Sequence, residues 1–391
     1  MRLPPRTFSA CLCALFASAA AFAANASPRP PAEIATQLCV GCHGPNLTGG
    51  IAPNLLDDTW KYGSDDASIL RSIAVGFPAT GMAGFANQMS EAEQKEFVAY
   101  LRRRARAFAL GGVPASVTPP ASLEIKSEKQ VFRLETFTPG LETPWGIVFL
   151  PDRSLVVSDR VGKLWAIAPD GKLNPEPVKN SPKTFVKQDG GYLDLIAHPD
   201  YAKNGWLYLA YVELGEKPET SMTVIVRGRI ANHTWTDEKV IFRAPQKYYY
   251  KDTSHYGCRF LFDPQGNLFF TLGERGNAPE SQDLTSPLGK IHRVTADGAP
   301  APGNPFLDRK DVWPSIWTYG NRHPQGLQYH PVTGKLWGTE HGPKGGDELN
   351  RIEPGRNYGW PTISHGEVQF REVIEGKERA GMEQPLAHWS P

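Results

Sequence analysis

The sequence predicts a mainly β fold of the β-propeller type, preceded by a small all-α domain. Glycine and proline are abundant, with 38 and 35 residues in a chain of 391, and beyond about residue 108 they separate short apolar runs. Such punctuation is typical of strands and turns. A strand–turn–strand pattern recurs there at spacings of 48, 65 and 67 residues, and this recurrence indicates propeller blades.

Residues 1–26 predict a secretory signal peptide. Arg2 and Arg6 precede an apolar stretch from about Ala10 to Ala23, which is too short to cross a bilayer and ends in small residues suited to cleavage. No later segment is long and apolar enough for a transmembrane helix. We therefore expect an exported protein of bacterial type that resides in the periplasm.

The charge balance excludes two classes of partner. The chain has 42 basic and 41 acidic residues, which gives a formal net charge of +1. This near-neutral balance predicts neither a nucleic-acid-binding surface nor a polybasic membrane patch. The length suffices for two domains with cores of their own.

Residues 27–109 predict the small helical domain. One expected helix covers Asp65–Ala74, and a second begins at a capping box, Ser90-Glu91-Ala92-Glu93, whose serine and last glutamate can satisfy each other's backbone amides. The apolar faces of these two helices are Ile69, Leu70 and Ile73, and Phe97, Val98 and Leu101.

The run Cys39-Val40-Gly41-Cys42-His43 is the most specific motif in the chain. Two thiols three positions apart, followed at once by a histidine, are typical of c-type haem attachment. Cys39 and Cys42 become thioethers, and His43 binds the iron. A four-cysteine zinc site needs a second pair, and outside the signal peptide only Cys258 remains. A chance match in a solvated loop is the other alternative.

The second axial ligand of the haem iron is predicted to be Met82. It ends a loop, Gly76–Met82, that is rich in residues unfavourable to helix and lies between the two expected helices. Histidine–methionine ligation raises the reduction potential and suits electron transfer. Met89 is the competitor, but it stands at the entry to the capped helix, where a core position is expected. A buried Met82 that binds no metal is a further alternative.

Residues 110–130, which contain three prolines, predict a linker, and residues 131–391 predict the propeller. Each expected hairpin turns at a proline, and the four are Pro151, Pro199, Pro264 and Pro331. The second strands are expected at Ser154–Ser158, Trp206–Tyr211, Asn267–Leu272 and Lys335–Gly338. A β-sandwich is the alternative, which the register shared by the hairpins disfavours.

The hairpin register brings reactive residue types to one rim of the propeller. His255 and Arg322 each lie nine residues before the turn proline of their hairpin. Because each turn is at the opposite end, both should lie beside the ends of the second strands. We therefore expect His255 near Glu274 and Arg322 near Glu340–Pro343.

These residue types indicate acid–base and electrostatic chemistry. His255 is a candidate general base, since an unperturbed imidazole titrates near working pH. Arg322 suits a negatively charged oxygen, and the loop Glu340–Glu348 offers carbonyls and carboxylates of the kind that bind Ca²⁺. The alternatives are a structural loop histidine, a surface cation and a solvated turn. His198 and His330 directly precede turn prolines, and we interpret them as structural residues of the far rim.

Five runs carry a resemblance to a known family: Gly190–Asp194, Ser254–Arg259, Tyr319–Gly326, Glu340–Glu348 and Asn357–Pro361. Through them the stretch from about Leu141 to Trp389 resembles the soluble PQQ-dependent aldose sugar dehydrogenases of the glucose/sorbosone dehydrogenase family, which are six-bladed propellers. The preceding helical domain resembles monohaem cytochromes c, including Pro53 in the loop after the haem-binding motif.

The resemblance implies that PQQ binds at this rim, beside Asp189, His255, Arg322 and His323. It implies that His255 takes the proton of the substrate hydroxyl while hydride passes to the quinone. Arg322 would then stabilise the oxyanion that develops on the quinone.

Calcium is the third cofactor that the resemblance implies. It would be bound partly by the carbonyls of Gly342 and Pro343 and would polarise the quinone. Glu348 and Tyr358 match further calcium positions of the family.

The chain departs from the family pattern in several places. Asp189 stands where glutamine is usual, His323 where asparagine is usual, and Cys258 replaces a glycine. An acid beside a tri-anionic quinone is expected to weaken binding unless it is protonated or bound to calcium. The family also continues beyond the position of Pro391, so we expect a truncated propeller whose four hairpins leave unpaired edges.

The sequence therefore predicts a periplasmic quinoprotein that oxidises aldose sugars with PQQ and passes electrons to its own haem c. A periplasmic or membrane respiratory protein would be the final acceptor. A calcium-dependent propeller hydrolase similar to lactonases is the second hypothesis, but it gives the haem no role. The third is a non-catalytic electron-transfer protein whose propeller docks partners.

Overall fold

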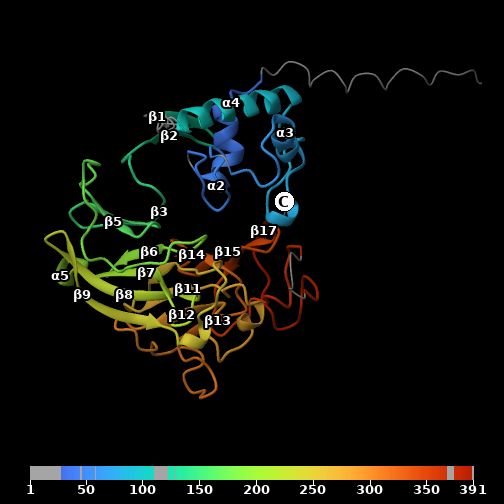
Figure 1. Cartoon of the computed structure of the whole chain (residues 1–391). Coiled ribbons are helices and arrows are strands. Elements are labelled where there is room, and N and C mark those ends of the chain that lie inside the picture. The colour runs from blue at the N-terminus through green and yellow to red at the C-terminus, as the bar shows by residue number, and fades with distance from the viewer. Residues whose placement is uncertain are drawn as a thin grey trace, which may run out of the picture. The chain divides into compact units, whose positions relative to one another are not determined.

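The computed structural model describes residues 28–44, 46–57, 59–109, 122–127, 129–367 and 374–389 (Figure 1). The predicted signal peptide lies outside these ranges, as do residues 110–121 of the predicted linker. The chain divides into two compact units, one before and one after the Pro119–Pro120 boundary. The first is helical and the second consists mainly of antiparallel sheets.

The N-terminal unit is built from helices around one apolar core. The predicted apolar faces are confirmed, because their residues are buried together in that core, namely Ile69, Ile73, Phe97, Val98 and Leu101. The helical segments are α1 (Pro31–Ile34), the π-helical turn η1 (Ala35–Cys39), α2 (Val40–His43), α3 (Asp66–Val75), the 3₁₀ turn η2 (Pro78–Thr80) and α4 (Glu91–Ala109).

The predicted capping box at the start of α4 is confirmed. The backbone amide of Ser90 donates to the Glu93 carboxylate at 2.8 Å, and the amide of Glu93 donates to the Ser90 hydroxyl at 3.2 Å. Arg29 adds an ion pair to the same carboxylate at 2.9 Å. The hydrogen bond from Arg29 is the largest cause that lowers the pKa of Glu93 to about 2.

Part of the predicted linker is a strand. Ser122–Lys126 forms β1, which pairs antiparallel with β2 (Val131–Glu135). The linker prediction is wrong for these residues because it followed the nearby prolines. Leu123 and Ile125 alternate with polar residues in the sequence, and that alternation is itself a strand pattern.

Four antiparallel sheets of three or four strands follow one another along the described part of the C-terminal unit (Figure 1). Within each sheet the strand order equals the sequence order, as in propeller blades.

The first blade contains β3 (Pro144–Phe149), β4 (Leu155–Asp159) and β5 (Lys163–Ile167). The second contains β6 (Tyr192–Ala197), β7 (Leu207–Leu214), β8 (Ser221–Ala231) and β9 (Thr234–Arg243). The third contains β10 (Phe260–Phe262), β11 (Leu268–Leu272), β12 (Lys290–Val294) and β13 (Ile316–Tyr319). The fourth contains β14 (Pro324–Tyr329), β15 (Leu336–Glu340), β16 (Asp347–Arg351) and β17 (Ala387–Trp389).

The predicted hairpins are confirmed, since β4, β7, β11 and β15 lie at the expected second-strand positions and pair with the strands before them. The first strands of the blades lie next to one another: β3 contacts β6, β6 contacts β10, and β10 contacts β14. First strands that contact in this way surround the axis of a propeller. The starts of these strands therefore meet at one rim.

The far-rim histidines have the structural role that the sequence predicts. Nδ1 of His198 accepts the amide of Asp200 at 3.0 Å, and Nδ1 of His330 accepts the amide of Val332 at 3.2 Å. A one-turn helix, α5 (Tyr201–Asn204), lengthens the second hairpin, where no helix is predicted. Two 3₁₀ turns, η3 (Gln246–Tyr248) and η4 (Ala278–Ser281), lie in loops between strands.

The fold class is thus mainly β with propeller blades, and the number six remains an expectation of the family resemblance. None of the helices in the described ranges has the length and apolar character that crossing a membrane requires.

Candidate active site and haem-attachment site

The haem-attachment motif lies on two consecutive helical segments. Cys39 ends η1, and Cys42 and His43 lie in α2. Both cysteines are free of disulfides. Nδ1 of His43 lies 2.7 Å from the carbonyl oxygen of Pro53, so Nδ1–H donates to that carbonyl and Nε2 is left for a metal. Such a bond fixes the ring orientation of a metal-binding histidine, and these residues fit a c-type haem.

The two candidate methionines differ in their surroundings. Met82 is half-buried, and its amide and carbonyl pair with those of Phe77 to close a tight loop. Gly76 and Gly81 have φ values of +70° and +84° in this loop, a conformation that favours glycine. Met89 is only 3% exposed and packs in the helical core. The core position expected for Met89 is confirmed, and Met82 stays the predicted ligand.

His255 precedes β10 and is held by two carboxylates. Its Nδ1 donates to Oε1 of Glu274 at 2.7 Å, and its backbone N–H donates to Oδ2 of Asp189 at 3.2 Å. Glu274 follows β11 and is 1% exposed. Because a carboxylate can only accept a hydrogen bond, Nδ1 of the neutral imidazole carries the ring proton, and Nε2 keeps the lone pair that a general base needs.

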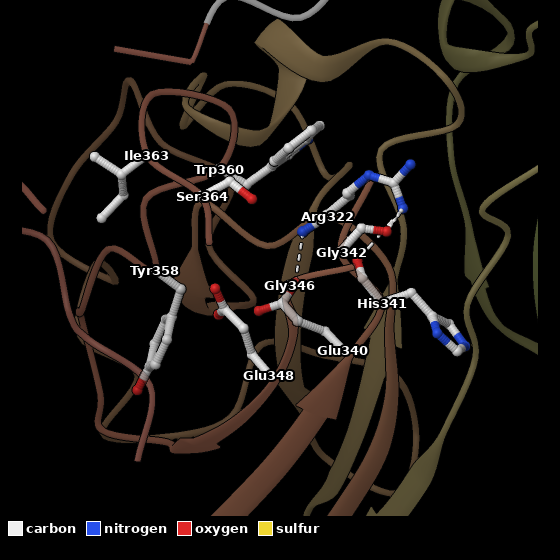
Figure 2. Close-up of a pocket in the computed structure, with 10 residues that line it drawn as sticks. All are labelled: Arg322, Glu340, His341, Gly342, Gly346, Glu348, Tyr358, Trp360, Ile363 and Ser364. Carbon is white, nitrogen blue, oxygen red and sulfur yellow. Dashed lines mark hydrogen bonds between the residues drawn. The ribbon is translucent and has the colours of Figure 1, made fainter. Parts of the chain in front are cut away.

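Arg322 precedes β14 at the same rim. Its backbone amide donates to the Glu340 carboxylate at 2.7 Å, and Nη1 donates to the carbonyl of Gly342 at 2.8 Å (Figure 2). The backbone N–H of Glu274 donates to the Arg322 carbonyl at 3.0 Å. The predicted placement of Arg322 beside Glu340–Pro343, and of His255 beside Glu274, is therefore confirmed. Glu274 is hydrogen-bonded to both residues.

Of the three residues that depart from the family pattern, Asp189 and His323 contact His255, and Cys258 is buried. The carboxylate of Asp189 accepts its backbone N–H, and the ring centroid of His323 lies 4.9 Å from that of His255. Nε2 of His323 accepts from the side-chain amide of Gln325 at 2.6 Å. Burial, together with the neighbouring His255, lowers the pKa of His323 well below its usual range, so its ring is neutral at pH 7.

The donor set of this rim fits an anionic, planar cofactor. Arg322 supplies a permanent positive charge, and its guanidinium lies 5.1 Å from the ring centre of Trp360. His255 and His323 present two imidazoles side by side. The negative charge of Asp189 is engaged by the His255 amide, so the expected repulsion of an anionic quinone is reduced.

A small cavity lies beside Arg322 and has an acidic wall (Figure 2). Glu340, Gly342, Glu348 and Tyr358 line it. Burial is the main cause that raises the pKa of Glu340 and of Glu348 above the ordinary range of a glutamate. Buried carboxylates with raised pKa values gain most from a nearby cation.

This cavity fits a calcium ion in part. The carbonyl of Gly342 accepts from the Arg322 guanidinium at 2.8 Å, so a calcium ion would share this oxygen with a cation. Pro343 follows in the same loop. The Tyr358 hydroxyl is turned to the Arg351 carbonyl, 2.6 Å away. Within the described ranges no three His, Cys, Asp or Glu side chains are grouped to hold a metal. A calcium site here would therefore depend on main-chain carbonyls.

The sequence predicts no role for Glu274 or Arg275. The register places Glu274 beside His255, and a carboxylate at a strand end next to a candidate base is a usable signal. Arg275 gives no such signal, because nothing in the sequence reveals that its side chain is 1% exposed.

Two family models match the chain. The one described as Glucose / Sorbosone dehydrogenase matches residues 141–391, and the one described as Cytochrome C oxidase, cbb3-type, subunit III matches residues 26–101. Among curated proteins, the aldose sugar dehydrogenase YliI of Escherichia coli (strain K12) is 35% identical over 265 residues, which cover 66% of this chain and 70% of that protein.

Solved structures that are similar to this chain are also aldose sugar dehydrogenases. The apo-form of the soluble aldose sugar dehydrogenase from Escherichia coli is 35% identical, with a TM-score of 0.60 over 64% of this chain and 73% of that one. The PQQ-bound form of aldose sugar dehydrogenase from Streptomyces coelicolor is 30% identical, with a TM-score of 0.54 over 70% of this chain and 74% of that one.

Proposed function

This chain belongs to the glucose/sorbosone dehydrogenase family, and we propose on that basis that it oxidises aldose sugars with PQQ and passes the electrons to its own haem c. One observation supports this most strongly. Glu274 accepts Nδ1–H of His255 at 2.7 Å and donates its backbone N–H to the carbonyl of Arg322 at 3.0 Å. A base and a cation from neighbouring blades are thereby fixed at one rim.

The side chains at this rim suit the oxidation of a sugar hydroxyl. PQQ, when bound, supplies the acceptor for hydride, and the residues that would hold it are Asp189, His255, Arg322 and His323. Nε2 of His255 is free to take the hydroxyl proton, since Nδ1 is engaged by Glu274. Arg322 keeps a positive charge beside the developing negative charge, where a fixed cation is most effective. Neutral His323 adds no second charge.

The helical unit would hold the haem. Cys39 and Cys42 would form the thioethers, and Nε2 of His43 and the sulfur of Met82 would be the ligands of the iron. The haem, when bound, supplies one-electron chemistry. A sugar oxidation releases two electrons, and a haem in the same chain would offer a one-electron acceptor for each of them before a respiratory partner.

We also propose that the protein binds a calcium ion and resides in the periplasm. The oxygens that would hold calcium are the main-chain carbonyls of Gly342, Pro343 and Tyr358 and the carboxylate of Glu348, and the support is the acidic cavity beside Arg322. The haem-attachment motif Cys39–His43 and the signal-like residues 1–26 support a periplasmic location.

The test is a sugar-oxidation assay on the full chain. We expect that apo-protein supplied with PQQ and Ca²⁺ reduces an added dye in the presence of aldoses, and that His255→Ala lowers the rate by at least about 10²-fold. Hydrolysis of a lactone without PQQ would instead support the propeller hydrolase. Folded, haem-loaded protein with neither activity would support the non-catalytic electron-transfer protein.

A further inference from the structure

Arg275 is a buried cation beside the loop that carries His255. Its Nη1 donates to the Ser254 carbonyl, and its Nη2 donates to the carbonyls of Asp252, at 2.5 Å, and Ser221, at 3.2 Å. The guanidinium lies 3.5 Å from the ring centre of Tyr256. All of these partners come from the segments on either side of His255 or from the start of β8.

The arrangement around Arg275 is unusual because its hydrogen bonds within the described residues go to carbonyls and a hydroxyl and to no carboxylate. Burial is the main cause that lowers its pKa. A buried charge with no hydrogen-bonded carboxylate is costly unless other contacts compensate it. The negative charges of Asp252 and Glu274 favour the charged guanidinium without accepting a hydrogen bond from it. Three main-chain carbonyls and an aromatic face provide that compensation here.

One peptide unit is held from both ends. The carbonyl of Ser254 and the N–H of His255 belong to the same peptide plane. Arg275 binds the carbonyl, and Oδ2 of Asp189 accepts the N–H at 3.2 Å. The plane therefore cannot rotate without loss of a charge-assisted hydrogen bond at one end or the other.

His255 needs such support because its backbone is in the left-handed region, with a φ of +53°. Residues other than glycine adopt this conformation at a cost, and they keep it only where surrounding contacts fix it. If the peptide before it turned, the imidazole would leave Glu274 and the position in which Nε2 faces the rim.

We infer that Arg275 is a positioning residue that fixes the backbone of His255 through the Ser254 carbonyl, while its neighbour Glu274 fixes the ring. The inference rests on the proposed function, in which His255 is the base. Two consecutive residues after β11 thus hold the side chain and the main chain of the same histidine.

The experiment compares Arg275→Lys with Arg293→Lys in the full chain. Arg293 is a matched control, because it is also buried in the third blade but pairs at the far rim with Asp263, at 2.6 Å. Nitrogen-detected NMR of the apo-protein reports which ring nitrogen of His255 carries the proton, without any cofactor. Steady-state kinetics of the protein supplied with PQQ and Ca²⁺ report kcat and KM.

We expect Arg275→Lys to lower kcat by about 10- to 100-fold with little change in KM, as for a misplaced catalytic group. We also expect His255 to lose its single Nδ1–H tautomer in this variant and to keep it in Arg293→Lys. A folded Arg275→Lys protein with wild-type kcat and a wild-type His255 tautomer would overturn the inference. If Arg275→Lys does not fold, Arg275→Gln, which keeps donors without a buried charge, is measured instead.

The variant His255→Ala distinguishes a failure of the proposed function from a failure of the role inferred for Arg275. If that variant stays active, the proposed function fails and the base lies elsewhere. If it is inactive while the folded Arg275 variant behaves as wild type, only the role of Arg275 fails.

Discussion

Glu274 links His255 and Arg322 at the rim of the proposed active site. It is 1% exposed, and its Oε2 has no hydrogen-bond partner among the described residues. Its Oε1 is bound by the His255 ring at 2.7 Å. A buried carboxylate in this position holds the imidazole in one tautomer and stabilises the imidazolium that forms when it takes a proton.

Glu274→Gln is expected to lower kcat by about 10²-fold, because an amide keeps the shape of the carboxylate and loses its charge. The measurement is dye reduction by aldose in the protein supplied with PQQ and Ca²⁺. The control is Glu280→Gln, since Glu280 accepts from a neutral phenol, Tyr250, at 2.7 Å. Equal rates for the two variants would show that the charge of Glu274 is not used.

His323 gives the rim a pH-dependent stability. Burial lowers its pKa well below the usual range, so below about pH 6.5 the unfolded imidazole binds a proton that the folded one does not. The folded state therefore loses stability as pH falls, by about 1.4 kcal/mol per pH unit for one group. Above about pH 6.5 both states are neutral and the effect is absent.

His323→Asn is expected to remove this acid sensitivity. Thermal unfolding of the variant and of the wild type is measured between about pH 5 and 8. The difference between the two midpoints should change below about pH 6.5 and stay constant above it. A difference that is the same at every pH would mean that His323 is protonated in the folded state.

The hairpins are the elements that the sequence predicts best, for a physical reason. A proline fixes φ in the turn, and one-residue shifts would move apolar side chains to the wrong face. The positions of Pro264 and Pro331 therefore suffice to place His255 and Arg322 at one rim. The role of Asp189 could not be predicted in the same way, because its contact with the His255 amide is made between blades.

Elements without a local signal are predicted less well. Strand β1 is missed beside its prolines, and α5 is missed because a single helical turn leaves no periodicity. Arg275 is missed because polar residues are read as exposed unless a partner is known. Its partners are main-chain carbonyls, which the sequence does not mark.

Replacing Met82, which ends the loop Gly76–Met82, and replacing Met89, which packs in the helical core, should have different effects. Met82→Ala is expected to abolish the sulfur–iron charge-transfer absorption of the oxidised haem and to lower its reduction potential. Met89→Ala should keep that absorption and lower the free energy of unfolding of the helical unit by about 2–5 kcal/mol, since Met89 is buried. Optical spectra and thermal unfolding distinguish them. Loss of the absorption in Met89→Ala alone would reverse the assignment.

The raised pKa values of the two glutamates in the loop Glu340–Glu348 predict that calcium changes how the stability of the fold depends on pH. The pKa of Glu340 and of Glu348 is raised in the fold, so without calcium stability falls as pH rises from about 4.3, the pKa of an ordinary glutamate. Bound calcium favours the charged carboxylates and should flatten that decline. Unfolding midpoints with excess Ca²⁺ and with a chelator are compared across this range. Identical curves would place calcium elsewhere.

At the scale of the whole molecule, the chain joins two kinds of redox unit. The family match at residues 141–391 and the cytochrome match at residues 26–101 lie in different compact units. Each unit keeps its own core, so each can hold its cofactor site independently. The composition predicts this division, because helical periodicity ends where glycine and proline begin to punctuate short strands.

The most direct test is rapid mixing of aldose with the full chain, loaded with oxidised haem, PQQ and Ca²⁺, while the haem absorbance is recorded. We predict that the haem is reduced at a rate independent of protein concentration, and that His255→Ala abolishes this reduction. A haem that stays oxidised while an added dye is reduced, or one reduced equally fast in His255→Ala, would contradict transfer from sugar to haem within one chain.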